Sequence, residues 1–435
     1  MHEDSPTKPA GAASAPEPER VGSGSGVDGD VDPGADEADT LRGQGPQILV
    51  LSATLFVAMV GFGVVIPALG DLALRFGASS IEMGAMTAAY ALAQLLFAPL
   101  WGALCDRVGR KPVLVLGLFG FSLSFLLMGL AESFGGLMAG RVLGGLLSAS
   151  ALPTAQAFAA DLAGPRDRAV VMGRLGAAMA SGFVLGPVLS ALLLPFGARA
   201  PFAFSLVLSL LTALAALVFL REPRRSPTTA ANVAAGGGAW RVLVYAAASP
   251  AAVWFWSAFV IMFGASSVFA LLVFFVEEHL GGTALDASIA FACFGGASAL
   301  VQGVLLRQLT SRLGERNTVR LALLVGCVGF TGFALAASVP HVYVATTFVG
   351  AGMALARPCL SALASTETTL GQGLTMGVQS AFDALGRVLG PLGAGLTYQL
   401  TPWAPFACAA GVYLIGLALV SATRRPGRSE PPVPG

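Results

Sequence analysis

MGRLGAAMASGFVLGP, residues 172–187, is matched 204 positions later by MGVQSAFDALGRVLGP, residues 376–391. Both stretches begin with Met-Gly, share a glycine at positions 182 and 386, and end in Val-Leu-Gly-Pro. A weaker echo links Arg-Val-Gly-Arg at 107–110 with Arg-Leu-Gly-Glu-Arg at 312–316. Two halves in the same order predict a duplicated polytopic protein. Parallel repeats of this kind are typical of transporters that rock about a site between their halves.

The composition of the chain places it in a membrane. It is 55% hydrophobic and only 11% charged over 435 residues, which is far more apolar than a soluble domain. Cutting at Pro, Gly and charge clusters leaves twelve runs near the ~20 residues that a bilayer-spanning helix needs. The runs are 47–69, 82–104, 112–131, 134–160, 170–194, 200–220, 250–276, 285–306, 318–339, 341–364, 374–399 and 403–422. We therefore predict an all-α membrane protein with twelve transmembrane helices in two pseudo-symmetric six-helix bundles.

The hydrophilic stretches divide the chain into five parts. Residues 1–46 are rich in Gly, Pro, Ala and Asp and predict a disordered tail. This tail has no apolar core of the kind found in a cleaved signal peptide, so the first helix is expected to direct insertion. An amino-terminal bundle at 47–220, a central loop at 221–248, a carboxy-terminal bundle at 249–422 and a second tail at 423–435 complete the prediction.

Lysine and arginine in the short loops predict the orientation. If the amino terminus lies inside, fourteen Lys and Arg residues fall in inner loops and only Arg75 and Arg199 in outer loops. Inner loops carry the excess of positive charge, so both termini are expected in the cytoplasm of a multi-pass protein of the plasma (inner) membrane. The sequence shows no basic surface interleaved with aromatics, and we expect no nucleic-acid partner.

The segment Gly102-Ala103-Leu104-Cys105-Asp106-Arg107-Val108-Gly109-Arg110-Lys111 joins the second and third predicted helices. It resembles the signature of the major facilitator superfamily, in which an acid follows a glycine by four residues and Gly-Arg-Arg/Lys comes three further on. The resemblance spans residues 47–422. We expect Gly102 to let two helix backbones approach closely. We expect Asp106 to lie at a neighbouring helix amino terminus and interact with its dipole.

The resemblance implies that this loop is an inner latch that holds the outward-open state. The implied ionic core is Asp106, Arg110 and Asp161, the last at the inner end of the fourth helix. The remaining members of the latch motif are Gly102, Arg107, Gly109 and Lys111. The alternative is an ordinary positive-inside anchor with solvated charges. The second copy has Ser311 where the first has Asp106, so we expect the second latch to be weaker or absent.

The fifth helix carries a further resemblance. Gly182-Phe183-Val184-Leu185-Gly186-Pro187-Val188-Leu189-Ser190 is similar to the antiporter signature Gly-x-x-x-Gly-Pro-x-x-Gly, with Ser190 in place of the last glycine. In the family this signature accompanies efflux by proton exchange, as in the twelve-helix multidrug and tetracycline exporters. Gly182 and Gly186 present a small face to a partner helix, and Pro187 permits a kink. The alternative is a motif that serves packing alone.

Four ionisable residues fall at membrane depth, where charge is costly and usually marks a pathway. Arg141 resembles the fourth-helix arginine that the family uses in proton coupling. Asp383 and Arg387 are four residues apart and share a helix face, and Arg357 is expected at a similar depth. The four residues are therefore predicted to couple protons to transport. The alternative is a permanently paired cluster that fixes helix packing.

The first predicted helix lacks an acid. Many tetracycline and multidrug exporters carry one near the position of Ala58, whereas none occurs here between Gln47 and Gly70. The central charges leave a net positive centre, so we hypothesise an anionic or zwitterionic cargo. Aromatic and amide side chains on the presumed cavity helices are the candidate substrate contacts. They are Tyr90, Gln94, Gln156, Trp254, Trp256, Phe263 and Gln379.

The function we predict is secondary export of a small organic molecule or drug in exchange for protons, by a monomer without cofactor or metal. A proton-linked importer of an organic anion is the first alternative, because it would use the same arginines. A non-transporting membrane receptor or scaffold is the second, and it needs neither the loop motif nor buried charges. No Gly-x-x-x-x-Gly-Lys-Ser/Thr, His-Glu-x-x-His or Gly-x-Ser-x-Gly occurs, which argues against an ATP-driven pump and against an enzyme.

Overall fold

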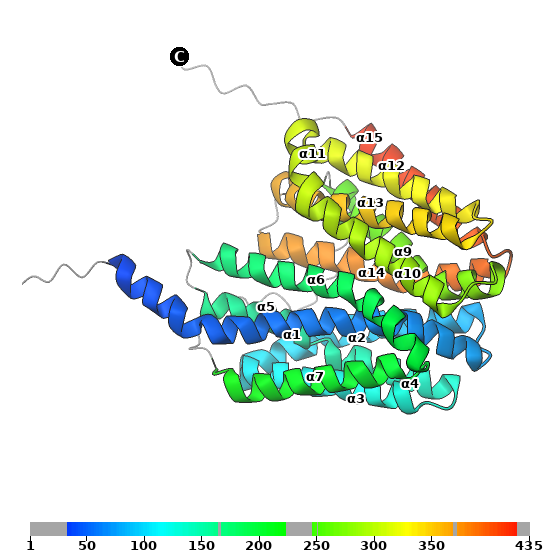
Figure 1. Ribbon diagram of the computed structural model, residues 1–435. Coiled ribbons are helices and arrows are strands. Elements are labelled where there is room, and N and C mark those ends of the chain that lie inside the picture. Colours follow the sequence, from blue (N-terminus) through cyan, green and yellow to red (C-terminus); the bar gives the residue numbers. More distant parts are fainter. Residues whose placement is uncertain (1–32, 164–166, 223–245, 250, 369–371, 424–435) are drawn as a thin grey trace, which may run out of the picture. The chain divides into compact units, whose positions relative to one another are not determined.

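The fold is known from a computed structural model that describes residues 33–163, 167–222, 246–249, 251–368 and 372–423. The regular elements of these residues are all helices (Figure 1). Residues 1–43 form one unit and residues 44–435 another, and the helix packing below concerns the second. Most of the predicted amino-terminal tail, the central loop and the carboxy-terminal tail lies outside the described residues.

The helices of the first half follow the predicted runs closely. They are α1 (Pro33–Arg75), α2 (Ser80–Val108), α3 (Arg110–Leu130), α4 (Phe134–Ser148), α5 (Ala151–Leu162), α6 (Arg168–Leu193) with the 3-10 turn η1 (Leu194–Phe196), and α7 (Ala200–Phe219). The predicted run 134–160 is divided into α4 and α5. Pro153 has no N–H to donate to the carbonyl of Ala149, so the helical hydrogen bonding is interrupted at this turn.

The second half contains the same sequence of long helices. They are α9 (Ala252–Phe274) with the π-helical η3 (Phe275–His279), α10 (Ala284–Leu300), η4 (Val301–Leu305), α11 (Leu306–Leu313), α12 (Glu315–Ala334), α13 (Val339–Glu367), α14 (Gln372–Tyr398) and α15 (Ala404–Ala422). α10, η4 and α11 are continuous, because η4 is a π-helical turn inside a single long rod, Ala284–Leu313.

Eleven helical stretches among the described residues are long and apolar enough to cross a membrane. The first of them is Gly45–Arg75, although α1 itself begins at Pro33. The predicted run 374–399 corresponds to α14, which is long enough but carries Gln379, Asp383 and Arg387 and is not among the eleven. The prediction of twelve spans in two bundles therefore stays a prediction at this point.

The helix pairings repeat between the halves. α3 packs against α7 and α2 against α4, and in the second half α12 packs against α15 and α10 against α13. Two further close pairs join the halves, α14 with α2 and α10 with α6. If α4 and α5 count as one rod, α2 and α14 are the second and eleventh long helices, and α6 and α10 are the fifth and eighth. The duplication seen in the sequence is thus also a duplication of contacts.

The repeated glycines make equivalent contacts in both halves. A β-carbon on Gly182 of α6 would collide with the carbonyl oxygen of Phe56 in α1. A β-carbon on Gly386 of α14 would lie 2.7 Å from the carbonyl oxygen of Phe259 in α9. Both glycines therefore permit a backbone approach that any larger residue would block. The repeat that decides the fold is a packing device between the first and fifth long helices of each half.

The contact between the two halves differs at the two ends of α2 and α14. At one end, a β-carbon on Gly395 of α14 would lie 2.6 Å from the backbone oxygen of Ser80 in α2, and the Ser80 hydroxyl donates to the Gly395 carbonyl at 3.1 Å. At the other end of the same two helices, a β-carbon on Gly102 or Gly377 would meet nothing within 4 Å. The halves are therefore in contact at the Ser80 end and separated at the Gly102 end. The expectation that Gly102 brings two backbones together is wrong for this conformation.

Candidate functional site

A cavity of about 500 Å³ lies between the two halves. Its walls come from α1, α2, α3, α4, α5 and α6 on one side and from α9, α10, η4, α13 and α14 on the other. Every long helix except α7, α12 and α15 therefore contributes. A volume of this size matches the pockets that hold drug-sized ligands, which usually measure ~300–1,000 Å³.

Phenylalanines from four helices join the two halves at the cavity wall. Phe62 of α1 and Phe183 of α6 each make an edge contact with Phe269 of α9, with ring centroids 6.2 and 6.1 Å apart. Phe294 of α10 adds centroid distances of 5.4 Å to Phe269 and 6.0 Å to Phe183. Edge-to-face aromatic pairs stabilise such contacts by ~0.5–1.5 kcal/mol each beyond their burial. We call this group, all of which lines the cavity, the phenylalanine seal.

Arg141 and Tyr90 form the polar wall on the first half. The Arg141 guanidinium lies over the Tyr90 ring, 4.3 Å from its centroid, and the residue is only 6% exposed. The Tyr90 hydroxyl pairs with the Ser148 hydroxyl at 3.1 Å and accepts a hydrogen bond from the Gln94 amide at 3.2 Å. The tyrosine is therefore held in place from two helices, and its ring face is fixed toward the arginine.

Arg357, Asp383 and Arg387 form the polar wall on the second half. An Arg357 Nη2 donates to Asp383 Oδ2 at 3.3 Å, which confirms the expected pair between α13 and α14. The Asp383 carboxylate is buried, whereas the Arg357 side chain is 49% exposed toward the cavity. Arg387 also lines the cavity and interacts electrostatically with Asp383 and with Tyr90 across it. The lining itself holds three guanidinium groups and no carboxylate, because Asp383 lies behind Arg357.

The structure brings only two of the seven predicted substrate contacts to the cavity wall, Tyr90 and Gln94. The other predictions are wrong for the cavity as it stands. Trp254 donates its indole N–H to Glu367 at 2.9 Å, and Gln379 donates to the Ser361 hydroxyl at 2.9 Å. The remaining three pack against neighbours just behind the wall. These are Trp256, against Phe382; Phe263, against the glycines of α14; and Gln156, whose amide donates to the Met179 sulfur at 3.6 Å.

Several cavity residues were missed by the sequence analysis. Besides the phenylalanine seal, five methionines line the walls, nearly half of the eleven in the chain. They are Met59, Met83, Met179, Met262 and Met353. Methionine side chains are flexible and polarisable and adapt to differently shaped partners. Methionines on several helices that face one another could have indicated a binding surface.

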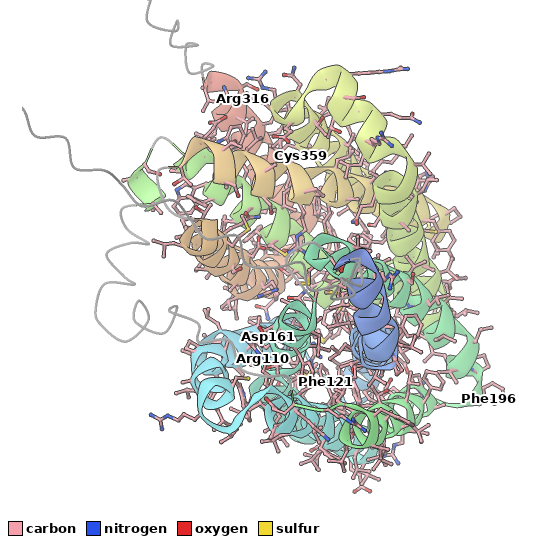
Figure 2. The ribbon with its side chains drawn as sticks, turned by 90° about the vertical axis from the view of Figure 1, so that its left-hand side faces the viewer. Arg110, Phe121, Asp161, Phe196, Arg316 and Cys359 are labelled. Atoms are coloured by element: carbon pink, nitrogen blue, oxygen red, sulfur yellow. The ribbon has the colours of Figure 1, made fainter. Side chains whose placement is uncertain are left out.

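The predicted latch pair is present in the first half. Arg110, at the start of α3, forms an ion pair with Asp161 at the end of α5, and Figure 2 shows the two side by side. Both carboxylate oxygens of Glu222, just beyond α7, accept from the backbone N–H groups of Arg110 and Lys111, at 2.6 and 2.9 Å. Glu222 therefore supplies the negative charge at the start of α3, a role no motif predicted. The side chain of Asp106 lies outside the described residues.

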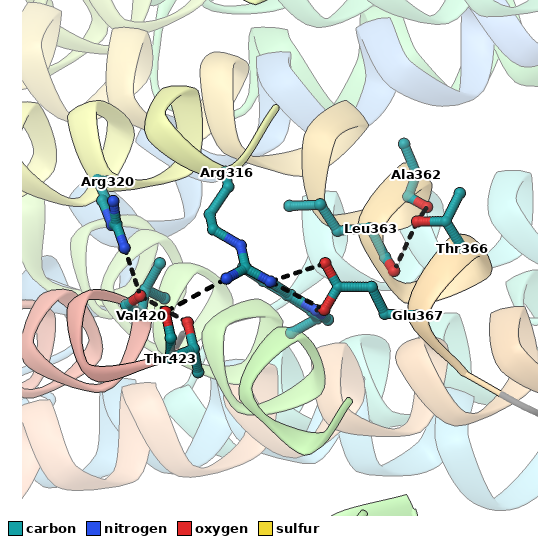
Figure 3. Close-up of polar contacts among 9 residues, drawn as sticks. Arg316, Arg320, Ala362, Leu363, Thr366, Glu367, Val420 and Thr423 are labelled. Carbon is teal, nitrogen blue, oxygen red and sulfur yellow. Dashed lines mark hydrogen bonds and ion pairs between the residues drawn. The ribbon is translucent and has the colours of Figure 1, made fainter. Parts of the chain in front are cut away.

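A second latch pair stands at the equivalent place in the other half, where we expected a weaker one or none. Arg316, at the start of α12, donates to Glu367 at the end of α13, at 2.9 and 3.2 Å, and to the Thr423 carbonyl at 3.2 Å (Figure 3). Its guanidinium lies 5.2 Å from the ring centroid of Trp254. The expectation rested on Ser311, which here only donates to the carbonyl of Gln308. The charge pair does not depend on that position.

Two features of the chain, the repeated packing and the cavity between its halves, agree with a comparison to known sequence families. The family described as the Major Facilitator Superfamily matches residues 51–369 and 255–435. The chain belongs to this superfamily. It is accordingly an integral, multi-pass membrane protein of a family whose members move small molecules across membranes.

Curated relatives cover nearly the whole chain. Multidrug resistance protein 1 of Bacillus subtilis (strain 168) is 32% identical over 87% of this chain and 96% of its own length. Quinolone resistance protein NorA of Staphylococcus aureus (strain Mu50) is 27% identical over 86% of this chain and 95% of its own.

Solved structures agree on the fold. The human organic anion transporter MFSD10 (TETRAN) superposes with a TM-score of 0.64 at 25% identity, over 87% of this chain and 99% of its own. The nucleoside transporter NupG reaches a TM-score of 0.72 at 14% identity, over 86% of this chain and 98% of its own, which bears on the fold alone.

Proposed function

We propose that the protein exports small organic molecules from the cell in exchange for protons, by alternating access. The observation that carries the proposal is a drug-sized cavity lined by both halves, with the halves in contact at the Ser80 end and separated at the Gly102 end. A scaffold would need neither a cavity nor arginines inside it. The names of the two curated relatives, multidrug resistance protein and quinolone resistance protein, support export of drug-like compounds.

The topology that this function requires has twelve spans in two bundles. We propose α14 as the twelfth span, because it is 27 residues long and packs closely against α2 and α9. Its charged side chains either line the cavity, as Arg387 does, or pair with Arg357, as Asp383 does, so they need not face lipid. An even number of spans puts both termini on the same side, and the arginine-rich loops put that side in the cytoplasm. The end with Ser80 is then the outer end, and the conformation is inward-facing.

Proton exchange is assigned to the Asp383 group. A buried carboxylate that is paired with a half-exposed guanidinium has two stable arrangements, ionised with Arg357 bound or protonated with Arg357 released. Protonation of Asp383 removes the charge that holds Arg357 to α14, and the charge of this carboxylate is thereby coupled to the arginines that line the cavity.

The two latch pairs belong to this cycle as restraints within each half. Arg110–Asp161 and Arg316–Glu367 are both formed while the inner ends of the halves are apart. The pairs therefore do not by themselves hold the inner end shut. We assign them to keeping each bundle rigid as it rocks, with the glycines of α2 and α14 available for closure.

The test uses proteoliposomes of known orientation with an imposed proton gradient. The probes share one aromatic body: 1-naphthaleneacetate, 1-naphthaleneacetamide and 1-naphthylmethylamine. We expect at least one probe to move from the cytoplasmic side outward while protons move in, and to stop when the gradient is collapsed. Movement of the acetate inward with protons would identify an importer and overturn export, and no movement of any probe would overturn transport.

The variant Asp383→Asn separates coupling from binding. We expect it to exchange labelled for unlabelled probe but to lose accumulation against a gradient. The matched control is Glu132→Gln, which changes an exposed acid on the loop between α3 and α4. Unchanged gradient dependence in Asp383→Asn would reduce this residue to a structural ion.

A further inference from the structure

The arginines that line the cavity outnumber the carboxylates near it. Arg141, Arg357 and Arg387 line it, and the single carboxylate nearby, Asp383, is engaged by Arg357 at 3.3 Å. No Asp or Glu belongs to the lining residues, and the described part of the first transmembrane helix has no acid before Asp71. Three guanidinium groups against one carboxylate leave two charges for which the described residues offer no counter-ion.

The missing counter-ion costs the most free energy at Arg141, because its guanidinium is buried and water does little to stabilise its charge. The residue is 94% buried by its 6% exposure, its Nε has no hydrogen-bond partner, and no ion pair to it occurs among the described residues. Its identified stabilising contact is the Tyr90 ring. A cation–π contact recovers only part of the cost of burying a charge, so the site gains strongly when an anion arrives.

Arg387 lines the same cavity from the opposite half, on α14, and Tyr90, whose ring lies beneath Arg141, lines it too. Hydrogen bonds with Ser148 and Gln94 fix the hydroxyl of Tyr90, so the ring that carries Arg141 has a defined position. A planar anion between the two guanidinium groups would receive paired N–H donors from either side, which is the geometry that favours carboxylates.

The rest of the wall suits an apolar body. Met59, Met179, Met262 and Met353 reach the cavity from four different helices, and the rings of the phenylalanine seal line it as well. Adaptable methionines accept varied ring systems, whereas the arginine pair demands one anionic group. The cavity therefore selects by charge and tolerates differences in shape.

We infer that the cavity binds the carboxylate of an organic anion or zwitterion between Arg141 and Arg387, with the aromatic or aliphatic body of the ligand against the methionines. This inference rests on the proposed function and names its substrate class.

The test is equilibrium binding to the purified full-length protein in nanodiscs, without any gradient. The probes are again 1-naphthaleneacetate, its neutral amide and the cationic 1-naphthylmethylamine, which differ chiefly in charge. We expect the acetate to bind about tenfold or more tightly than the amide, as charge-assisted hydrogen bonds imply. Equal affinity for acetate and amide, or tighter binding of the amine, would overturn the inference.

Two variants localise the effect. Arg387→Gln, at a side chain that lines the cavity, should remove most of the preference for acetate over amide. Arg141→Lys keeps the charge but not the planar guanidinium, and should weaken the preference in part. The control Arg312→Gln changes an exposed arginine at the end of α11 and should alter nothing.

The outcomes for the two proposals are separable. A strong preference for acetate without proton-driven movement would defeat the exporter and keep the anion site. Proton-driven movement of the amine together with no binding preference would defeat the anion site and keep the exporter. Retention of the full preference in Arg387→Gln, in folded protein, would place the carboxylate elsewhere and overturn the geometry proposed here.

Discussion

Adding one methyl group at Gly395 should shift the protein from the inward-facing toward the outward-facing state. A β-carbon at this position would lie 2.6 Å from the Ser80 carbonyl oxygen and 3.1 Å from the Ile81 Cα atom. Both are backbone atoms of α2 and cannot rotate away, so the two helices must separate. The same separation stretches the hydrogen bond from the Ser80 hydroxyl to the Gly395 carbonyl, now 3.1 Å long.

The magnitude follows from what differs between the two states. Gly395→Ala also gains helix propensity of ~1 kcal/mol, but α14 is a helix in both states and this gain cancels in the equilibrium between them. The overpacking cost of ~1–3 kcal/mol falls only on the state in which α2 and α14 touch at this end. A coupling of that size changes a two-state equilibrium by roughly 5–150-fold.

The assay is the reactivity of a cysteine inside the cavity from the outer side. Thr87→Cys places it on the α2 wall, in a background from which the five native cysteines have been removed. Right-side-out vesicles are treated with a membrane-impermeant maleimide, and Gly395→Ala should raise the labelling rate by roughly 5–150-fold. The control Gly411→Ala in α15 adds a methyl group where nothing lies within 4 Å. Equal labelling rates for the two variants would refute the assignment of this contact to the outer seal.

Three further changes test the inner end and the latches. Gly102→Val should leave the unfolding temperature unchanged, since nothing lies within 4 Å of its added β-carbon, yet slow the outer labelling of the cavity cysteine by hindering inner closure; unaltered labelling would contradict this. Glu367→Gln should destabilise the protein by about 1–2 kcal/mol, because Arg316 loses its charged acceptor, and thermal unfolding should show no such loss for the exposed neighbour Glu315→Gln. Glu222→Gln should cost ~0.3–1 kcal/mol at the start of α3, measured as a drop in unfolding temperature that shrinks at high salt; a deficit independent of salt would exclude the dipole explanation.

The order of the helices could be read from the sequence, because each span is an apolar run cut by Pro, Gly and charge. Even α14 was found this way, although its polar residues make it less apolar than the other eleven. The Arg357–Asp383 pair followed from the similar depth of its two residues in the membrane, and the Arg110–Asp161 pair was implied by the family resemblance. Their roles as latch and coupling site stay predictions.

The faces of the helices could not be read in the same way. Helices such as α9 are apolar all round, so no polar stripe tells which side meets the cavity, a neighbour or lipid. Trp254 and Phe263 were therefore assigned to the cavity, while Met262, Ser266 and Phe269 of the same helix are the residues that line it. Side-chain polarity gave a partial signal: Tyr90, Gln94 and the three arginines line the site, whereas Gln156 and Gln379 do not.

The contacts at the start of α12 show why comparison of motifs did not predict the second latch. In the first half a carboxylate beyond α7, Glu222, accepts from the free N–H groups at the start of α3. In the second half, Arg316 and Arg320 near the start of α12 donate to the Thr423 and Val420 carbonyls at the end of α15. Both arrangements tie the start of the third long helix to the end of the sixth and satisfy helix-end groups that would otherwise lack partners. The duplication has preserved this connection and the direction of its hydrogen bonds, from the start of the third long helix to the end of the sixth. It has exchanged the groups that form them: backbone N–H groups and a side-chain carboxylate in the first half, guanidinium groups and backbone carbonyls in the second, so a search for the same residue types could not find it.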